Sequence, residues 1–173
     1  GAVTFTSNDN TLTAAGAVGA VTFTGNGNAL TAAGNIASAN FAADVTATIS
    51  CIVAGDITTA ADGTGTLILL AGTLNNIGAD GAALNNLQIG DGAAAKAVTF
   101  GGDVFTTNVT LKDQATLTFA GAAAGVKTIT GNIVADAANH VTLILNDQRN
   151  ITGSVGADGA VIHQLQVQGT SIV

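Results

Sequence analysis

Short stretches of the chain alternate apolar residues with threonine and other small polar residues. In residues 2–6, Val3 and Phe5 fall on one side of an extended chain, while Thr4 and Thr6 fall on the other. Successive side chains of a β-strand point to opposite faces, so this pattern predicts a strand with one buried and one exposed face. The same alternation predicts further strands at residues 21–23, 45–53, 98–100, 116–119, 126–130 and 141–145.

The chain also repeats itself on two scales. Residues 1–16 return as residues 19–34, and a longer echo relates 66–69 to 142–145 and 77–89 to 155–167. Self-similarity at a fixed period is typical of a solenoid, in which each unit buries its apolar face against its neighbour. The two short repeats differ at three pairs of positions: Ser7/Gly25, Asp9/Gly27 and Thr11/Ala29.

These patterns predict an all-β fold: a parallel β-solenoid, taken as a right-handed β-helix, that forms a single elongated domain over residues 1–173. Within it we expect a coil pair at residues 1–34 and two long repeat units at approximately 19–97 and 98–173. With roughly 18 to 25 residues in each coil and about 4.8 Å between strands, the chain would form about seven to nine coils. The pattern leaves open whether each coil has two or three sheets.

Composition agrees with a narrow, layered β-structure. Apolar residues make up 47% of the chain and charged residues only 9%, and Trp, Tyr, Met and Pro are absent. Asn and Asp gather with Gly between the expected strands, where they favour turns. Asn residues stacked from coil to coil are expected to form hydrogen-bonded ladders at the corners.

The charge of the chain narrows the range of partners. The formal net charge is −7, and only four residues are cationic. Nucleic acids and anionic lipids are bound through Lys and Arg, so neither is an expected partner. We find no run of eighteen apolar residues and no signal peptide, so we expect no direct membrane insertion, and we interpret the chain as a segment of a longer or processed protein.

Few side chains suggest catalysis, and we predict no catalytic residue, metal site or cofactor. The two histidines lack a partner at ligand spacing; His140 is expected on the solvent face, and His163 is expected to be partly buried beside Leu165. Cys51, the single cysteine, shares a face with Ile49 and is expected to be a small buried hydrophobic residue.

Three further features have both an ordinary and a functional interpretation. Asp147 and Arg149 favour a solvated turn, although they could border a lyase-type site. The GADGA sequences at Gly78 and Gly156 favour turns, although Asp-Gly corners can bind Ca²⁺. Thr-x-Thr triplets favour the outward face of strands, although regular threonine arrays can bind ice; they start at Thr4, Thr11, Thr22, Thr46 and Thr116.

Three segments share a composition rich in Gly, Ala, Thr and Asn within the long repeat units: AVTFTGNGNALTAAGNI, TLTFAGAAAGVKTITGNIVADA and NITGSVGADGA. In this composition and repeat length the chain resembles the passenger regions of rickettsial surface-cell-antigen autotransporters, the group containing the rickettsial outer membrane proteins A and B. The likeness covers nearly the whole chain. It implies a β-helical passenger that is exported across the outer membrane and contributes to adhesion, entry into host cells and virulence. It carries over no binding residue to this chain.

We therefore predict an extracellular segment of a bacterial cell-surface protein, which acts as a structural stalk and as an adhesin toward a host-cell surface protein. It is not predicted to be an enzyme. The alternative is a filament or surface-layer subunit that associates with itself through the solenoid ends, because an unpaired strand edge is a template for stacking.

Overall fold

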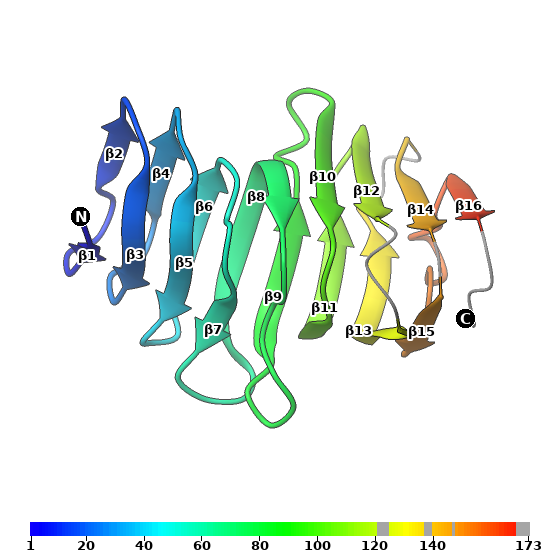
Figure 1. Cartoon of the computed structure of the whole chain (residues 1–173). Helices are drawn as coiled ribbons and strands as arrows, with labels where there is room; N and C mark the ends of the chain where they lie inside the picture. Colours follow the sequence, from blue (N-terminus) through cyan, green and yellow to red (C-terminus); the bar gives the residue numbers. More distant parts are fainter. Residues whose placement is uncertain (121–124, 137–139, 147, 169–173) are drawn as a thin grey trace.

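The computed structural model describes residues 1–120, 125–136, 140–146 and 148–168. Within these ranges the chain forms β-strands and no helix, and each strand pairs in parallel with a strand of the next coil. The strands stack side by side along one axis from the N-terminal to the C-terminal end (Figure 1). The prediction of an all-β parallel solenoid in a single domain is therefore confirmed. The described residues include no helix that could span a membrane.

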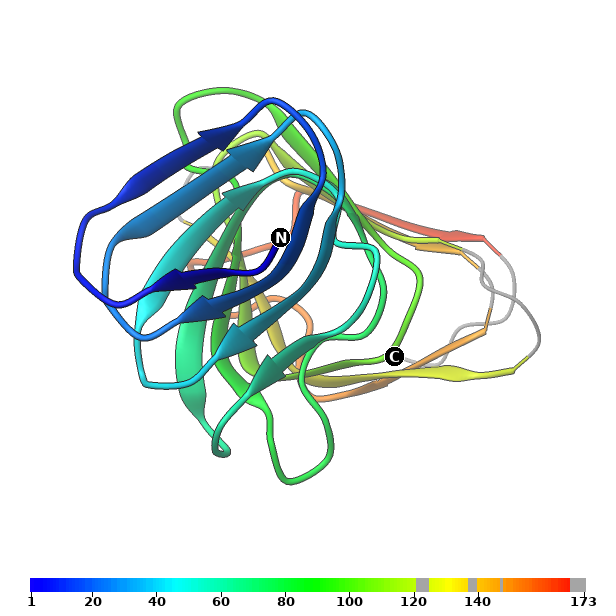
Figure 2. The ribbon, with the colours of Figure 1, turned by 60° about the vertical axis from the view of Figure 1, so that its left-hand side comes forward.

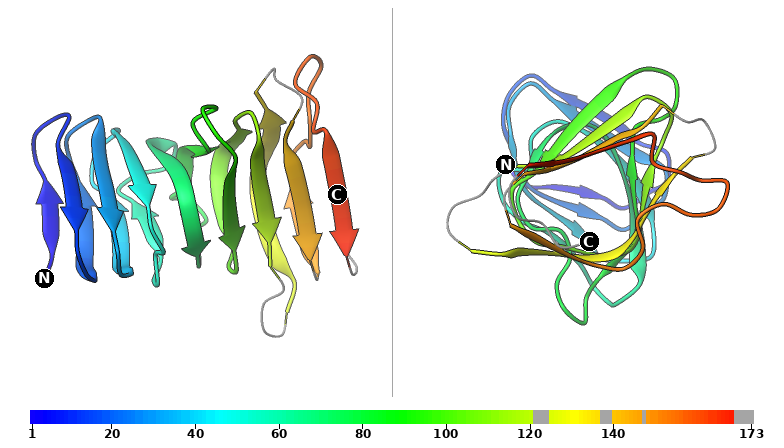
Figure 3. Two further views of the ribbon diagram at one scale, coloured as in Figure 1. Left: turned by 90° about the horizontal axis from the view of Figure 1, so that it is seen from above. Right: turned by 90° about the vertical axis from the view of Figure 1, so that its right-hand side faces the viewer.

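Each complete coil has three sides, and the chain visits them in a fixed order (Figures 2 and 3). The first side carries β1 (Val3–Phe5), β3 (Val18–Phe23), β5 (Ile36–Phe41), β7 (Ile57–Thr59) and β15 (Arg149–Thr152). The second carries β2 (Thr11–Ala14), β4 (Asn28–Ala32), β6 (Thr46–Ser50) and β9 (Leu84–Ile89). The third carries β10 (Lys96–Phe100), β12 (Ala115–Phe119), β14 (Thr142–Asn146) and β16 (Gln164–Gln168). Three long strands turn a corner: β8 (Thr64–Leu74), β11 (Val104–Leu111) and β13 (Lys127–Ala135).

One buried column of stacked residues runs along the first side, and the sequence spacing between its members gives the length of each coil. The strand register places its members directly above one another: Val3, Val21, Ala39, Ile57, Ile77, Val104, Ile129 and Ile151. The first three steps of this column are equal, the step from Ile77 to Val104 is the longest, and the column as a whole spans about eight coils. The short sequence repeat is therefore the coil length of the first coils, while later coils are longer.

The core is a stack of thin apolar layers, as the alternation predicts. Phe23 lies between Phe5 and Phe41, with ring centroids 5.2 and 5.3 Å from its own. A second aromatic pair, Phe100 and Phe119, has a centroid distance of 5.5 Å on the third side. Apolar layers that repeat in register let each coil bury its inner face on the next one.

The longer echo relates segments that lie on different sides of the solenoid. Residues 66–69 belong to β8 on the second side, and their counterparts 142–145 belong to β14 on the third. Likewise, Ile77 stacks on the first side, and its counterpart Val155 stacks on Ile133 of the second. The offset of this echo thus does not correspond to a whole number of coils.

Two of the differences between the short repeats coincide with contacts between the coils. A Cβ atom on Gly25 would lie 2.1 Å from the backbone oxygen of Ser7, and one on Gly27 would lie 2.1 Å from the side chain of Asp9. The second coil therefore carries glycine where the first carries Ser7 and Asp9. A side chain on Gly25 would clash with the backbone of the first coil, and one on Gly27 would clash with the Asp9 side chain.

Candidate functional site

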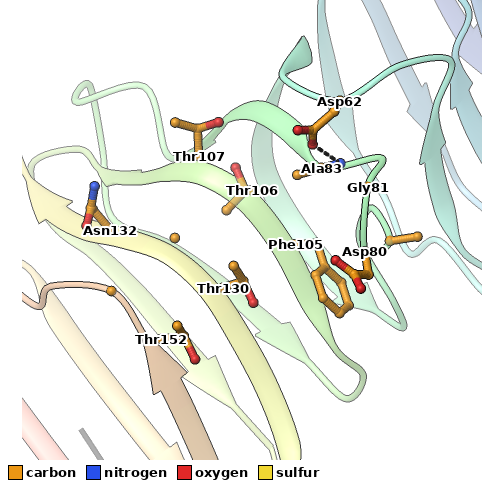
Figure 4. Close-up of a pocket in the computed structure, with 13 residues that line it drawn as sticks. Asp62, Asp80, Gly81, Ala83, Phe105, Thr106, Thr107, Thr130, Asn132 and Thr152 are labelled. Carbon is orange, nitrogen blue, oxygen red and sulfur yellow. Dashed lines mark hydrogen bonds between the residues drawn. The ribbon is translucent and has the colours of Figure 1, made fainter.

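Among the described residues, an open groove lies on the first side, with a volume of about 490 Å³ (Figure 4). Its floor continues an outer column of short polar residues. In the first four coils this column consists of Thr4, Thr22, Asn40 and Thr58, which stack in register. In the later coils it consists of Phe105, Thr130 and Thr152.

Gly78 interrupts this column beside Phe105. Gly78 has a φ of 64°, and a Cβ atom there would lie 2.4 Å from the backbone oxygen of Phe105 and 3.2 Å from its Cβ. Only glycine avoids both the left-handed strain and the clash. After Gly78 the chain leaves the sheet as a small hairpin, closed by paired backbone hydrogen bonds between Ala79 and Ala82. This hairpin forms one wall of the groove (Figure 4).

The groove carries negative charge. Asp80, at the tip of the hairpin, and Asp62, in the corner of the preceding coil, both contribute to its lining. The Asp62 carboxylate accepts a hydrogen bond of 2.9 Å from the backbone N–H of Ala83, which fixes its position. Among the described residues that line the groove, none is Lys, Arg or His. The groove therefore attracts cations and repels anions.

Asp62 belongs to a corner ladder that runs through the first half of the solenoid. Its members, which follow one another at equal intervals along the chain, are Asn8, Asn26, Asp44 and Asp62. Each side-chain oxygen accepts a hydrogen bond of 2.8 to 3.0 Å from a backbone N–H of the following coil. The expected corner ladder is confirmed. In this column the donor is the backbone, and nearby the side-chain amide of Asn10 donates a hydrogen bond of 3.2 Å to Oδ1 of Asn28.

The second GADGA sequence also forms a hairpin, closed between Ala157 and Ala160. Both sequences are therefore turns, as predicted. No group of three or more His, Cys, Asp or Glu side chains is arranged to hold a metal ion within residues 1–120, 125–136, 140–146 and 148–168.

The two histidines lie on successive coils at a corner of the solenoid. His140 is exposed, as predicted, and its Nδ1 lies 3.1 Å from Oδ1 of Asp113. Its ring centroid lies 6.2 Å from that of His163. The expectation that His163 is partly buried is wrong, because it precedes β16, where Leu165 and Val167 are also exposed.

Cys51 is buried beside Ile49 and Val53, as predicted. Burial raises the pKa of the Cys51 thiol, and a hydrogen bond involving the backbone of Ala32 opposes this with a smaller effect. A thiol that stays protonated is a poor nucleophile, so Cys51 functions as part of the core.

Arg149 does not lie in a solvated turn, which corrects the prediction; Asp147 lies outside the described residues. Arg149 is 1% exposed because it begins β15, whose alternation places Arg149 and Ile151 on the inner face. Its Nη1 donates to the carbonyl oxygen of Gly102 at 3.0 Å, and its Nη2 donates to that of Ala120. The guanidinium carbon also lies 5.6 Å from the centre of the Phe119 ring. Arg149 thus joins neighbouring coils from within.

The Thr-x-Thr triplets lie on the outward faces of their strands, as predicted. The threonines do not form an unbroken array on the first side, because Asn40, Gly78 and Phe105 interrupt their column. Asn40 takes part in it by donating a hydrogen bond of 2.8 Å to the hydroxyl of Thr58.

Comparison with protein-family models, curated proteins and solved structures finds no match to this chain.

The groove itself was not predicted from the sequence. The chain does hold one signal for it, because Phe105 is the one phenylalanine that is followed directly by two threonines, whereas the other five belong to core layers.

Proposed function

We propose that this chain is an extracellular β-helical segment of a bacterial surface protein, in which it acts as a stalk and presents an adhesive face to a host-cell surface protein. The observation that carries the proposal is the continuous buried column from Val3 to Ile151, which makes the molecule a short rod with a surface of small polar side chains. Such a rod extends and displays surface rather than enclosing a substrate.

The surface also suits contact with a partner. Its outer columns are Thr and Asn residues held in register by the sheet, so they offer a preorganised set of hydroxyl and amide groups. A rigid surface loses little conformational entropy on binding, which favours recognition over a broad face.

One observation supports a second candidate, self-assembly through the C-terminal end. β16 is the last strand of its sheet among the described strands, and Leu165 and Val167 on it are 44% and 47% exposed. An apolar strand edge of this kind can pair with another copy of the chain.

A single preparation tests both candidates. The purified chain is followed by light scattering and electron microscopy over a concentration series and is then tested for binding to host-type cells. Monomeric rods that bind cells saturably support the adhesive stalk. Filaments that grow with concentration and bind no cells support self-assembly and contradict adhesion.

Charged substitutions separate the two further. Replacing both residues, Leu165→Lys and Val167→Lys, is expected to abolish filaments if the end of the solenoid stacks, since a buried Lys is costly. The matched control is Ile52→Lys, because Ile52 is an apolar residue that is 42% exposed far from the end. Loss of cell binding in the control alone would place the adhesive contact near Ile52 instead.

A further inference from the structure

Phe105 differs from every other phenylalanine of the chain. The other five are buried in the core, whereas Phe105 is partly exposed on an outer column that otherwise consists of short polar residues and Gly78. An aromatic ring on an otherwise polar surface gains nothing from core packing. Aromatic residues are, however, enriched where proteins contact their partners.

The surroundings of Phe105 give its ring a defined space and a defined charge. Gly78 lies close against the backbone of Phe105, and the hairpin that follows brings Asp80 to the same groove as the ring. Asp62 supplies a second carboxylate that is fixed by its bond from Ala83. The negative π face of an aromatic ring and nearby carboxylates attract the same kind of group, a cation.

The chain already makes one contact of this type internally. The guanidinium of Arg149 lies over the ring of Phe119 in the core. The groove repeats the aromatic half of this contact at the surface, with no Lys or Arg among the described residues that line it.

We propose that this groove binds a lysine or arginine side chain of a basic partner protein. The cation lies over the Phe105 ring and pairs with the carboxylates of Asp80 and Asp62. The alkyl stem lies along Thr130 and Thr152, which continue the floor for two further coils, about 10 Å in all. This length suits one long side chain, whose stem can pack on apolar groups while its charged end stays near water.

This inference rests on the proposed function only in that the groove would be one of the contacts of an adhesive rod. The two fail separately. Peptide binding is measured on the purified chain without cells. If the chain adheres to cells but does not bind the peptide, the adhesive rod is supported and the groove is not. If the chain binds the peptide but not cells, the groove is supported and adhesion is not.

The test is fluorescence anisotropy of the intact chain with a labelled peptide of alternating lysine and serine. Saturable binding is expected, with an affinity that falls as ionic strength rises. Phe105→Thr restores the common residue of the column and is expected to weaken binding about two- to fivefold, which is the usual size of an exposed cation–π contact. Asp80→Asn is expected to weaken it by a similar factor.

Two variants serve as controls. Asp158→Asn changes the matching residue of the second hairpin, which does not line the groove, and it is expected to leave binding unchanged. Phe105→Leu keeps an apolar side chain but loses the π face, so it is expected to behave like Phe105→Thr. Circular dichroism confirms that each variant keeps its sheet.

Three results would overturn the proposal. Equal loss in Asp80→Asn and Asp158→Asn would show general attraction to a negatively charged protein. Full binding of the peptide by Phe105→Leu would show that binding does not depend on a cation–π contact. Binding of a neutral oligosaccharide that depends on Phe105, without binding of the basic peptide, would assign the groove to a glycan.

Discussion

The first four coils and the last four stack on one another through different kinds of contact. From Val3 to Ile57 the coils are uniform in length, whereas from Ile57 to Ile151 they are longer and differ from one another. All four cationic residues lie in the second half: Lys96, Lys112, Lys127 and Arg149.

The uniform half repeats one set of contacts. The corner oxygens of Asn8 and Asn26 accept a backbone N–H from the following coil, and Phe5, Phe23 and Phe41 stack through the core. The same atoms meet at each level because each coil has the same length.

The variable half adds contacts that occur once. Lys112 pairs with Asp136 at 2.9 Å and Lys127 pairs with Asp103 at 3.4 Å, each across 24 residues of chain. Arg149 adds a buried set of bonds inside the core. Ladder-type bonds persist in this half, because Asn76 accepts a hydrogen bond from the backbone N–H of Asp103, and Asp103 accepts one from that of Thr128. The contacts of the long side chains therefore add to the ladder.

The largest expected effect sharpens this comparison within the cores. Phe23→Ala opens a cavity in the middle of a three-ring stack and is expected to lower the free energy of unfolding by about 3 to 5 kcal/mol. Phe100→Ala removes a ring from a stack of two and is the matched variant in the other half. Urea denaturation with hydrogen exchange measures both. A Phe23→Ala variant as stable as the parent would contradict the layered core.

A second substitution tests the once-only contacts. Arg149→Met keeps an apolar body over Phe119 but removes the donors to Gly102 and Ala120, and it is expected to cost about 1 to 3 kcal/mol. Lys127→Met removes a partly exposed ion pair and is expected to cost no more than about 1 kcal/mol. If urea denaturation shows equal losses of unfolding free energy in the two variants, the burial of Arg149 adds nothing to stability.

A third substitution tests the uniform half through its own repeat. Gly25→Ser copies Ser7 into the second coil, where a Cβ atom would lie 2.1 Å from a backbone oxygen, and it is expected to cost about 1 to 3 kcal/mol. Ser7→Gly makes the reverse change at an exposed residue and is the control. Thermal unfolding ranks the two, and a neutral Gly25→Ser would refute the steric account.

The smallest expected effect concerns pH. Burial raises the pKa of the Cys51 thiol in the folded chain, so the stability that this group contributes is complete below the unfolded pKa of about 8.5 and is lost as pH rises through the folded value. Stability measured from pH 7 to 10 is expected to fall slightly in the parent and less in Cys51→Ala. Rapid alkylation of Cys51 in the folded chain would contradict its burial.

The sequence predicts those parts of the structure that depend on short range. Alternation placed Leu117, Leu143 and Ile49 inside, and they are buried, because side chains along a strand alternate whatever the strand pairs with. Alternation misplaced His163, and the interpretation of Arg149 as part of a solvated turn was wrong, because the environment of both residues depends on neighbouring coils. His163 lies beside the last described strand, and Arg149 faces carbonyl groups up to 47 residues away.

The candidate site was beyond sequence reasoning for the same reason. Phe105, Asp80 and Asp62 have no common motif, and the register that unites them passes through Gly78 and the hairpin after it. The longest coil separates Ile77 from Val104, and only the folded chain shows that these residues stack.

By itself, the sequence determined the parallel solenoid, the short coil of its N-terminal half and the inward and outward faces of its strands. These follow from local alternation and from direct repetition, since identical segments stack most easily in register. Tertiary structure alone decided which side each later segment occupies, that Arg149 is buried and that Phe105 lies in an acidic groove. Those outcomes depend on the lengths of the connections between strands, which set how far each coil turns before the chain meets its neighbour.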